Sequence, residues 1–303
     1  MIACLAGGVG GARLADGFHQ ARQPLSVVVN TGDDFVLHGL TICPDIDTVL
    51  YTLSGLSDHQ RGWGLAGDSA RCMEFLDKLG GETWFHLGDL DLATHLFRTQ
   101  ALTGASLTEV TRTLATRLGV RAEILPMSDQ PVRTRVRTHD GWLDFQDYFV
   151  RRAHRDEVLE LAFQGIDQAR PSPAVLEALG RADRLVICPS NPFVSVEPIL
   201  SLPGLRQAWC AASAPKLAVS PILGGQAVKG PAAQMLASLG HDVSSLGIAR
   251  LYAGLVDVLV LDECDRELVP AIEELGLRTV VCPTLMKTPA DRRALAERLL
   301  SIL

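Results

Sequence analysis

The chain opens with a strand-like apolar run that leads into a glycine-rich segment, MIACLAGGVGGARLADG. Residues 2–6 predict a β-strand, residues 12–21 have helical periodicity, and the apolar run 25–30 predicts a second strand. The glycines that join the first strand to the helix are Gly7, Gly8, Gly10 and Gly11. A strand, a helix and a strand in this order form a βαβ unit with parallel strands, so the opening predicts an α/β fold.

Four later runs repeat the pattern of a buried strand that ends in turn residues: RLVICPSN, KLAVSP, DVLVLDE and RTVVCP. Continuous Val, Ile and Leu runs are typical of a parallel sheet that helices cover on both faces. Residues from about 68 to 118 instead read as helices, and the alternating stretch around Asp140-Gly141 predicts a β-hairpin. We therefore expect one Rossmann-like domain over 1–303, with an inserted helical and β-hairpin cap over about 64–165.

The composition argues against several classes of protein. The formal net charge of -7 disfavours a nucleic-acid partner, because binding a phosphate backbone requires a concentrated basic surface. The seven cysteines are scattered and form no C-x-x-C pair, so they indicate neither a disulfide framework nor a zinc site. No run approaches the roughly 18 to 20 uncharged residues of a membrane span. We expect a cytoplasmic protein that works without a membrane.

The glycine segment matches two nucleotide-binding motifs only in part. In a dinucleotide-binding fingerprint Arg13 would have to be the third glycine, and Asn30 would have to be an acid that holds the ribose. The G-K-[ST] ending of an ATP-binding P-loop is also missing. What remains is a strand-to-helix turn whose N–H groups favour an anion, most often a phosphate, with Arg13 adding charge. A tight turn without a ligand is the alternative.

An acidic stretch follows the second strand, NTGDDFVLHGLTICPDIDTVLYTLSG. Its carboxylates Asp33, Asp34, Asp45 and Asp47 lie within fifteen residues and could hold Mg2+ beside the phosphates of the glycine segment. The other interpretation is a turn at Asp33-Asp34 and helix capping by Asp45 and Asp47. Composition alone leaves both open.

Two strands of the second half end in turns that also suit an anion. Ser190 and Asn191 stand between two prolines, and Gly225 precedes Lys229-Gly230-Pro231, where the proline suits a first helical position. Each motif alone could be a simple turn. Together with the glycine segment, three strand ends would meet in one crevice, which is how a nucleotide diphosphate is usually held.

The combined motifs resemble the 2-phospho-L-lactate transferase family, which makes the deazaflavin coenzyme F(420). The similar segments run in order from the first residue to about residue 286: GGVGGARL, VVNTGDDFVLHGLTICPDIDTVLYTLSG, RGWG, GDLDLATHLFRTQ, ILPMSD, FQDYFV, PSNPFVSVEPIL and SPILGGQAVKGPA. The resemblance implies a Rossmann-like fold, Mg2+, and a homodimer in some members. It also implies transfer of a phosphorylated small acid from a guanosine diphosphate-linked donor to 7,8-didemethyl-8-hydroxy-5-deazariboflavin (FO), with release of GMP.

The resemblance also implies roles for individual residues. Asp45 and Asp47 would hold the metal, with Asp47 also at the ribityl chain of FO, and Asp33 or Asp34 would orient or deprotonate the acceptor. The residues implied along FO are Trp63, His86, Asp89 and Asp91. The residues implied for the nucleotide are Gly7, Gly8, Gly10, Gly11, Arg13, Asn30, Ser190, Asn191, Gly225 and Lys229. The chain has Leu90 where the family commonly has an arginine.

Two other function classes compete with this transferase. A non-catalytic regulatory protein that binds nucleotide-sugars has a similar glycine segment, but it has no reason to pair the PDxD and GDxD stretches with an FO site. A nicotinamide dehydrogenase is disfavoured by Arg13 and Asn30. The donor acid stays open among phospholactate, phosphoenolpyruvate and 3-phosphoglycerate, because a few side chains can distinguish them.

Overall fold

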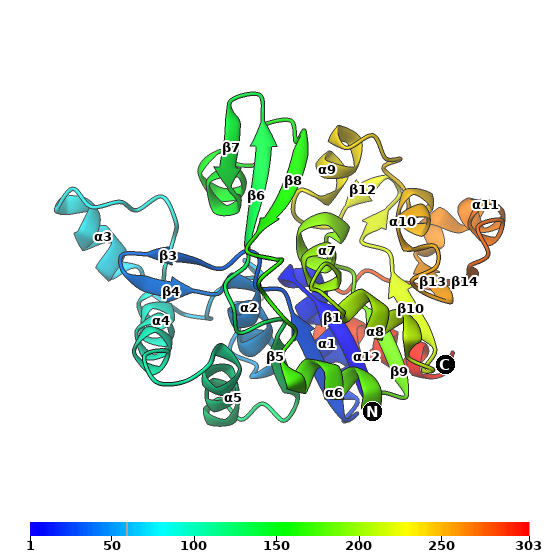
Figure 1. Ribbon diagram of the computed structural model, residues 1–303, viewed down its shortest axis with the longest axis horizontal. Helices are drawn as coiled ribbons and strands as arrows, with labels where there is room; N and C mark the ends of the chain where they lie inside the picture. Colours follow the sequence, from blue (N-terminus) through cyan, green and yellow to red (C-terminus); the bar gives the residue numbers. More distant parts are fainter. Residues whose placement is uncertain (59, 303) are drawn as a thin grey trace.

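A computed structural model describes residues 1–58 and 60–302 (Figure 1). Within these residues the main sheet has seven strands in the order β14-β13-β10-β9-β1-β2-β5, and every neighbouring pair is parallel. The strands are β1 (Ile2–Ala6), β2 (Leu25–Val29), β5 (Glu123–Pro126), β9 (Arg184–Ile187), β10 (Lys216–Val219), β13 (Val258–Leu261) and β14 (Arg278–Val281). The parallel α/β sheet predicted from the sequence is confirmed.

Helices cover both faces of this sheet, as the continuous apolar strands predict. In β1, Cys4 packs into a core with α1, α2, α5 and α12, and Leu5 packs into the opposite core. The helices of the first face are α1 (Gly8–Gln20), α2 (Pro44–Leu53), α5 (Leu107–Arg117) and α12 (Pro289–Leu300). Those of the second face are α6 (Pro173–Arg181), α7 (Glu197–Leu200), α8 (Leu205–Ala211), α9 (Ala232–Ser238), α10 (Ser245–Tyr252) and α11 (Val269–Glu273).

Two groups of elements project from the main layers (Figure 1). One contains the hairpin β3 (Phe35–Leu37) and β4 (Leu40–Ile42) with α3 (Arg71–Lys78) and α4 (Asp89–Ala101). The other is a small antiparallel sheet in the order β7-β6-β8, made of β6 (Arg133–Thr138), β7 (Gly141–Asp144) and β8 (Glu160–Gln164). The hairpin predicted around Asp140-Gly141 is present as β6 and β7. The segment 64–165 also contributes α5 and β5 to the main layers, so its projecting parts are separated along the chain.

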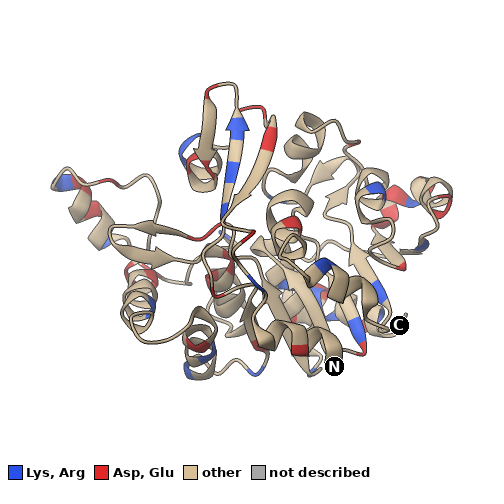
Figure 2. Ribbon diagram, viewed as in Figure 1, with Lys and Arg blue, Asp and Glu red and all other residues tan. Residues whose placement is uncertain are grey.

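The remaining elements are short and connect the main layers. They are the π-helices at Asp147–Arg151 and Pro192–Val196, the hairpin β11 (Ile222–Leu223) and β12 (Gln226–Ala227), and a 3-10 helix at Glu263–Leu268. Positive and negative side chains are interspersed over the chain as a whole (Figure 2). Two arginines of β6 face acids on the neighbouring strands, with Arg135 3.2 Å from Asp144 of β7 and Arg137 2.9 Å from Glu160 of β8. Among the described residues, no helix has the length and apolar character needed to cross a membrane.

Helix α1 begins at Gly8, inside the glycine segment, four residues before the start that the sequence predicts. The reason is a close contact between this first turn and the end of β9. A Cβ atom on Gly10 would overlap the carbonyl oxygen of Pro189, and one on Gly11 would lie 2.7 Å from Oγ of Ser190. The glycines therefore let the helix N-terminus pack against the neighbouring strand end.

This contact makes Gly10→Ala a test of the packing. We expect the substitution to lower the free energy of unfolding by about 1–3 kcal/mol, because backbone atoms must move to accept the added methyl group. Gly180→Ala in α6 is the matched control, since its Cβ would meet no atom of the described residues within 4 Å. Alanine in this exposed helical position should be neutral or stabilising by about 0.5–1 kcal/mol. Chemical denaturation measures both, and equal stabilities would contradict the packing.

Candidate active site

A cavity of about 550 Å³ lies at the carboxyl ends of the strands. It adjoins the point where the strand order reverses, because β1 stands between β2 and β9. Ligands of open α/β sheets bind at this kind of position. The cavity brings together many of the residues singled out by sequence: Gly7, Gly8, Gly10, Arg13, Asp33, Asp45, Asp47, Trp63, His86, Asp91, Ser190, Asn191 and Lys229. Those that do not line it are Gly11, Asn30, Asp34, Asp89 and Gly225.

The Asp45 carboxylate is hydrogen-bonded both to the glycine turn and to Asn30. Its Oδ1 accepts a hydrogen bond from the Gly8 N–H at 2.7 Å, and its Oδ2 accepts one from Asn30 Nδ2 at 2.9 Å. Burial raises the pKa of the Asp45 carboxyl to about 6, although these two hydrogen bonds favour its ionised form. Asn30 is fully buried and also donates to the Val194 carbonyl at 3.1 Å. Asn30 thus positions Asp45 instead of facing the cavity.

Ser190 braces the same turn from the neighbouring strand. Its Oγ accepts from the Gly7 N–H at 3.1 Å and donates to the Gly7 carbonyl at 2.9 Å. Asn191 caps the π-helix that follows, since its Oδ1 accepts from the Phe193 N–H at 2.9 Å. Both side chains line the cavity while they hold its walls in place.

Two basic side chains face the cavity at this end. Lys229 Nζ donates to the Arg61 carbonyl at 2.8 Å, and Arg13 donates to the Met286 carbonyl at 3.1 Å. Burial lowers the pKa of Lys229, and the positive charge of Arg13 lowers it further. The positive charges of Arg13 and Lys229 repel each other and lie beside a helix N-terminus, so an anionic ligand would be stabilised there.

Asp33 and Asp34 differ in their relation to the cavity. Asp33 lines it, and its buried Oδ1 has no hydrogen-bond partner within the described part of the chain. Burial raises the pKa of Asp33 well above its usual value, and the nearby charge of Asp45 raises it further. Asp34 lies behind the lining, and burial raises the pKa of its carboxyl to about 7. An unpartnered carboxylate oxygen beside a second carboxylate fits a hard cation such as Mg2+.

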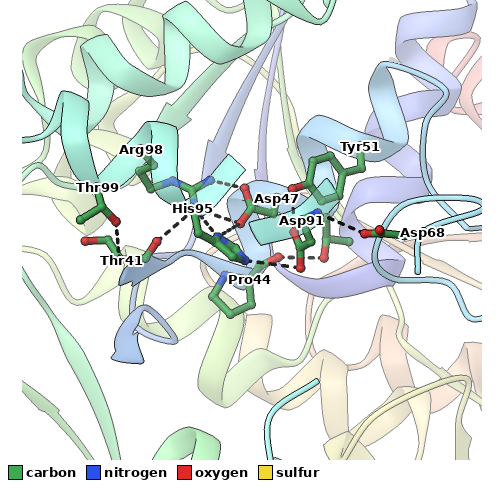
Figure 3. Close-up of polar contacts among 10 residues, drawn as sticks. Thr41, Pro44, Asp47, Tyr51, Asp68, Asp91, His95, Arg98 and Thr99 are labelled. Atoms are coloured by element: carbon green, nitrogen blue, oxygen red, sulfur yellow. Dashed lines mark hydrogen bonds and ion pairs between the residues drawn. The ribbon is translucent and has the colours of Figure 1, made fainter. Parts of the chain in front are cut away.

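Asp47 lies in a buried polar cluster between α2 and α4 (Figure 3). Arg98, which is fully buried, places both terminal nitrogens on the Asp47 carboxylate, with Nη1 3.1 Å from Oδ2. His95 Nδ1 lies 3.1 Å from the same Nη1, and His95 Nε2 lies 3.4 Å from Asp91 Oδ2. The Tyr51 hydroxyl donates to Asp91 Oδ1 at 2.7 Å. Burial raises the pKa of Asp47, and the guanidinium opposes this shift.

Asp47, Asp91 and His95 offer ligand atoms that all lie within 4.8 Å of one another. A metal ion could bridge such a group, but the guanidinium of Arg98 already neutralises Asp47 there. A second cation beside Arg98 would meet a like charge at low dielectric. In the hydrogen bonds described above, no guanidinium contacts Asp33 or Asp45. The edge formed by these two carboxylates therefore suits a magnesium ion better than the group of Asp47, Asp91 and His95 does.

Sequence reasoning did not place Tyr51, His95 and Arg98 in the site. Spacing carries a signal for two of them, since Tyr51 follows Asp47 by four residues and His95 follows Asp91 by four. Such pairs share one helix face. The contact between α2 and α4 that joins the two pairs has no sequence signal.

Aromatic side chains form another part of the lining: Trp63, Trp84, Phe85, His86, Phe145 and Phe149. The rings of Trp63 and His86 meet edge to face at 5.6 Å, and those of Phe145 and Phe149 stack at 5.5 Å. Flat aromatic ligands bind to such surfaces by stacking and edge contacts. The cavity therefore combines an aromatic part with an anion-binding part.

Asp89, which the family resemblance implies along FO, does not line the cavity. Its carboxylate accepts from the backbone N–H groups of Arg71 at 3.2 Å and Cys72 at 2.9 Å, so it holds the first turn of α3. Gly225, with φ of 74°, forms part of the turn between β11 and β12. Leu90, which follows Asp89, is 55% exposed.

Comparison with known proteins shows which family the chain matches. The model of the family "2-phospho-L-lactate transferase CofD" matches residues 2–284. The 2-phospho-L-lactate transferase of Methanosarcina acetivorans is 42% identical over 97% of this chain and 96% of its own length. The phosphoenolpyruvate transferase of Kitasatospora aureofaciens is 42% identical over 98% of this chain and 94% of its own length.

A solved structure supports the fold independently. A UPF0052 family protein of Bacillus halodurans superposes with a TM-score of 0.65 at 19% identity, over 99% of this chain and 98% of that one. At this identity the likeness concerns the fold alone. The family match and the relatives carry the assignment: the chain belongs to the 2-phospho-L-lactate transferase CofD family.

Proposed function

We propose that this transferase moves a phosphorylated small acid from a guanosine diphosphate-linked donor to the terminal ribityl hydroxyl of FO and releases GMP. One observation carries the proposal: a single cavity contains the α1 N-terminus with Arg13 and Lys229, a group of carboxylates, and an aromatic wall. These three parts match a diphosphate, a polyol chain and a flat ring.

In this proposal the hydroxyl oxygen of the ribityl chain attacks the phosphorus that carries the small acid. The new P–O bond forms as the bond to GMP breaks, GMP takes the electron pair, and a carboxylate accepts the hydroxyl proton. Arg13, Lys229 and the N-terminus of α1 would bind the diphosphate and stabilise the charge that moves to GMP. The aromatic residues would hold the ring so that the attacking oxygen lies in line with the bond that breaks.

The acids have separate tasks in this reaction. Asp47 and Asp91 would orient the ribityl hydroxyls, since Arg98 and Tyr51 hold their carboxylates in place. Asp33, or Asp34 behind it, would accept the proton, because a carboxyl with a raised pKa is the better base near neutral pH. Mg2+ bound by Asp45, at the edge that Asp45 shares with Asp33, would neutralise diphosphate charge.

The test is product analysis with purified protein, FO, magnesium and one of three guanosine diphosphate-linked donors. The donors carry phospholactate, phosphoenolpyruvate or 3-phosphoglycerate, and mass spectrometry identifies the deazaflavin product while chromatography measures GMP. We expect equal amounts of product and GMP with one donor, and no GMP when FO is left out. Nucleotide binding without product from any donor would favour the regulatory, non-catalytic alternative.

A further inference from the structure

The turn after β13 contains two acids that the proposed reaction does not use, Asp262 and Asp265. Asp262 caps the 3-10 helix Glu263–Leu268 with its Oδ1 at 3.3 Å from the Cys264 N–H. Asp265 is 2% exposed and lies inside that helix. Neither acid lines the cavity, but each binds a segment that does.

Asp265 holds the hairpin β11–β12. Its Oδ1 accepts from the Gly224 N–H at 3.0 Å, at a turn in which Gly224 and Gly225 both have positive φ. Its Oδ2 accepts from the Ser245 hydroxyl at 2.7 Å, and Ser245 Oγ lies 2.9 Å from Ser220 Oγ. The carboxylate thus joins the end of β10, the start of α10 and the hairpin turn.

The hairpin leads directly to the basic side of the cavity. Leu223 and Val228 line the cavity, and Lys229 follows β12 by two residues. Lys229 itself is exposed and is held by one hydrogen bond to a loop carbonyl. The buried carboxylate of Asp265 therefore helps to tie this segment to the sheet, together with the hydrogen bonds of Ser220 and Ser245 to the Ile222 backbone.

Asp262 anchors a second segment that lines the cavity, residues 284–286. Its Oδ2 accepts from the Thr284 N–H at 2.8 Å and from the Thr284 hydroxyl at 3.1 Å. Thr284 and Met286 line the cavity, and the Met286 carbonyl accepts from Arg13. One turn therefore supports both segments that carry or contact the basic side chains.

We propose that Asp265 is a positioning residue for the nucleotide side of the cavity: through Gly224 and Ser245 it sets the segment that presents Lys229. Asp262 has the matching role for residues 284–286. This inference rests on the proposed function for its ligand, a nucleoside diphosphate, but the anchoring itself can be tested without any substrate.

The first test measures the anchoring by limited trypsin digestion. We expect Asp265→Ala to speed cleavage after Lys229 by about tenfold, since a charge-assisted hydrogen bond of this kind is lost. Cleavage after other residues should not change. Glu263→Ala, an exposed acid of the same 3-10 helix, is the control and should cleave at the parent rate. Unchanged cleavage after Lys229 in Asp265→Ala would overturn the proposal.

The second test separates positioning from a general loss of structure. In Asp265→Ala we expect the KM for the guanosine donor and the Kd for GDP to rise by about tenfold. We expect kcat to fall as well, because Lys229 also stabilises the charge that moves to GMP, while the KM for FO stays within about threefold of the parent value. Asp265→Asn keeps an acceptor for Gly224 and should recover most of the affinity. Equal losses in kcat and in both KM values would contradict positioning.

A second variant and two further outcomes complete the test. Where Asp265→Ala does not fold, Ser245→Ala removes one partner of the carboxylate and should show the same faster cleavage and weaker GDP binding. If cleavage after Lys229 accelerates but no donor gives product, the anchoring stands and the proposed reaction fails. If product forms and Asp265→Ala binds GDP like the parent, the reaction stands and the positioning role fails.

Discussion

Replacing Arg98 with methionine is expected to lower the free energy of unfolding by about 3–5 kcal/mol. Arg98 is fully buried and neutralises the Asp47 carboxylate, which is 4% exposed. Burial lowers the pKa of Arg98, but the charge and hydrogen bond of Asp47, together with the nearby Cys43 and Tyr51 groups, outweigh burial and raise the pKa overall. Arg98 and Asp47 therefore depend on each other. Methionine keeps most of the volume and leaves Asp47 without its partner. Urea denaturation followed by circular dichroism measures the loss.

A matched control and a double variant sharpen this expectation. Arg293 forms an exposed ion pair with Glu297, so Arg293→Met should change stability by less than about 0.5 kcal/mol. Asp47→Asn with Arg98→Met should be less destabilising than the sum of the single changes, because neither charge is then left alone. A loss below about 1 kcal/mol in Arg98→Met would show that Asp47 does not need this partner.

Replacing Asp47 with asparagine is expected to lower kcat by about tenfold to hundredfold. The change removes the negative charge that faces the cavity and leaves the shape of the side chain nearly the same. Initial rates of GMP release, at saturating FO and donor, measure the effect over a range of magnesium concentrations. A higher magnesium requirement identifies Asp47 as a metal ligand, whereas an equal loss at every concentration identifies a role in orienting the acceptor.

The control for this substitution is Asp167→Asn, an exposed aspartate in the turn after β8. It should keep the parent rate at every magnesium concentration. Circular dichroism at the assay temperature shows whether the Asp47→Asn protein is folded, so that a lower rate is not the result of unfolding. Full activity of Asp47→Asn at limiting magnesium would exclude both roles.

Much of the fold could be read from local pattern. The apolar run Ile2–Ala6, the glycines and the run Leu25–Val29 are enough to predict a βαβ unit, because strand and helix periodicities differ and glycine marks the turn. The four later Val, Ile and Leu runs are β9, β10, β13 and β14. The order of these strands in the sheet, and the return of α5 and β5 from the cap segment to the main layers, have no local signal.

The candidate site shows the same division. Local pattern was sufficient to select Asp45, Asp47 and Ser190 as polar residues next to strand or helix ends. Local pattern could not predict their contacts. In the structure Asp45 accepts a hydrogen bond from the Gly8 N–H, and Asp89, selected by the same motif reasoning, holds the first turn of α3 and does not line the cavity.

Chain pattern alone established an α/β protein with a glycine turn, a cluster of carboxylates and two anion-suited strand ends. It could do so because residue type and spacing record periodicity, turn geometry and charge. Three contacts are visible only in the folded molecule. Arg98 neutralises Asp47, the carbonyl of Pro189 leaves no room for a Cβ atom at position 10, and Asp265 anchors the hairpin before Lys229. Each of these contacts joins residues 41 or more positions apart, and it exists only once the sheet and its helices have packed.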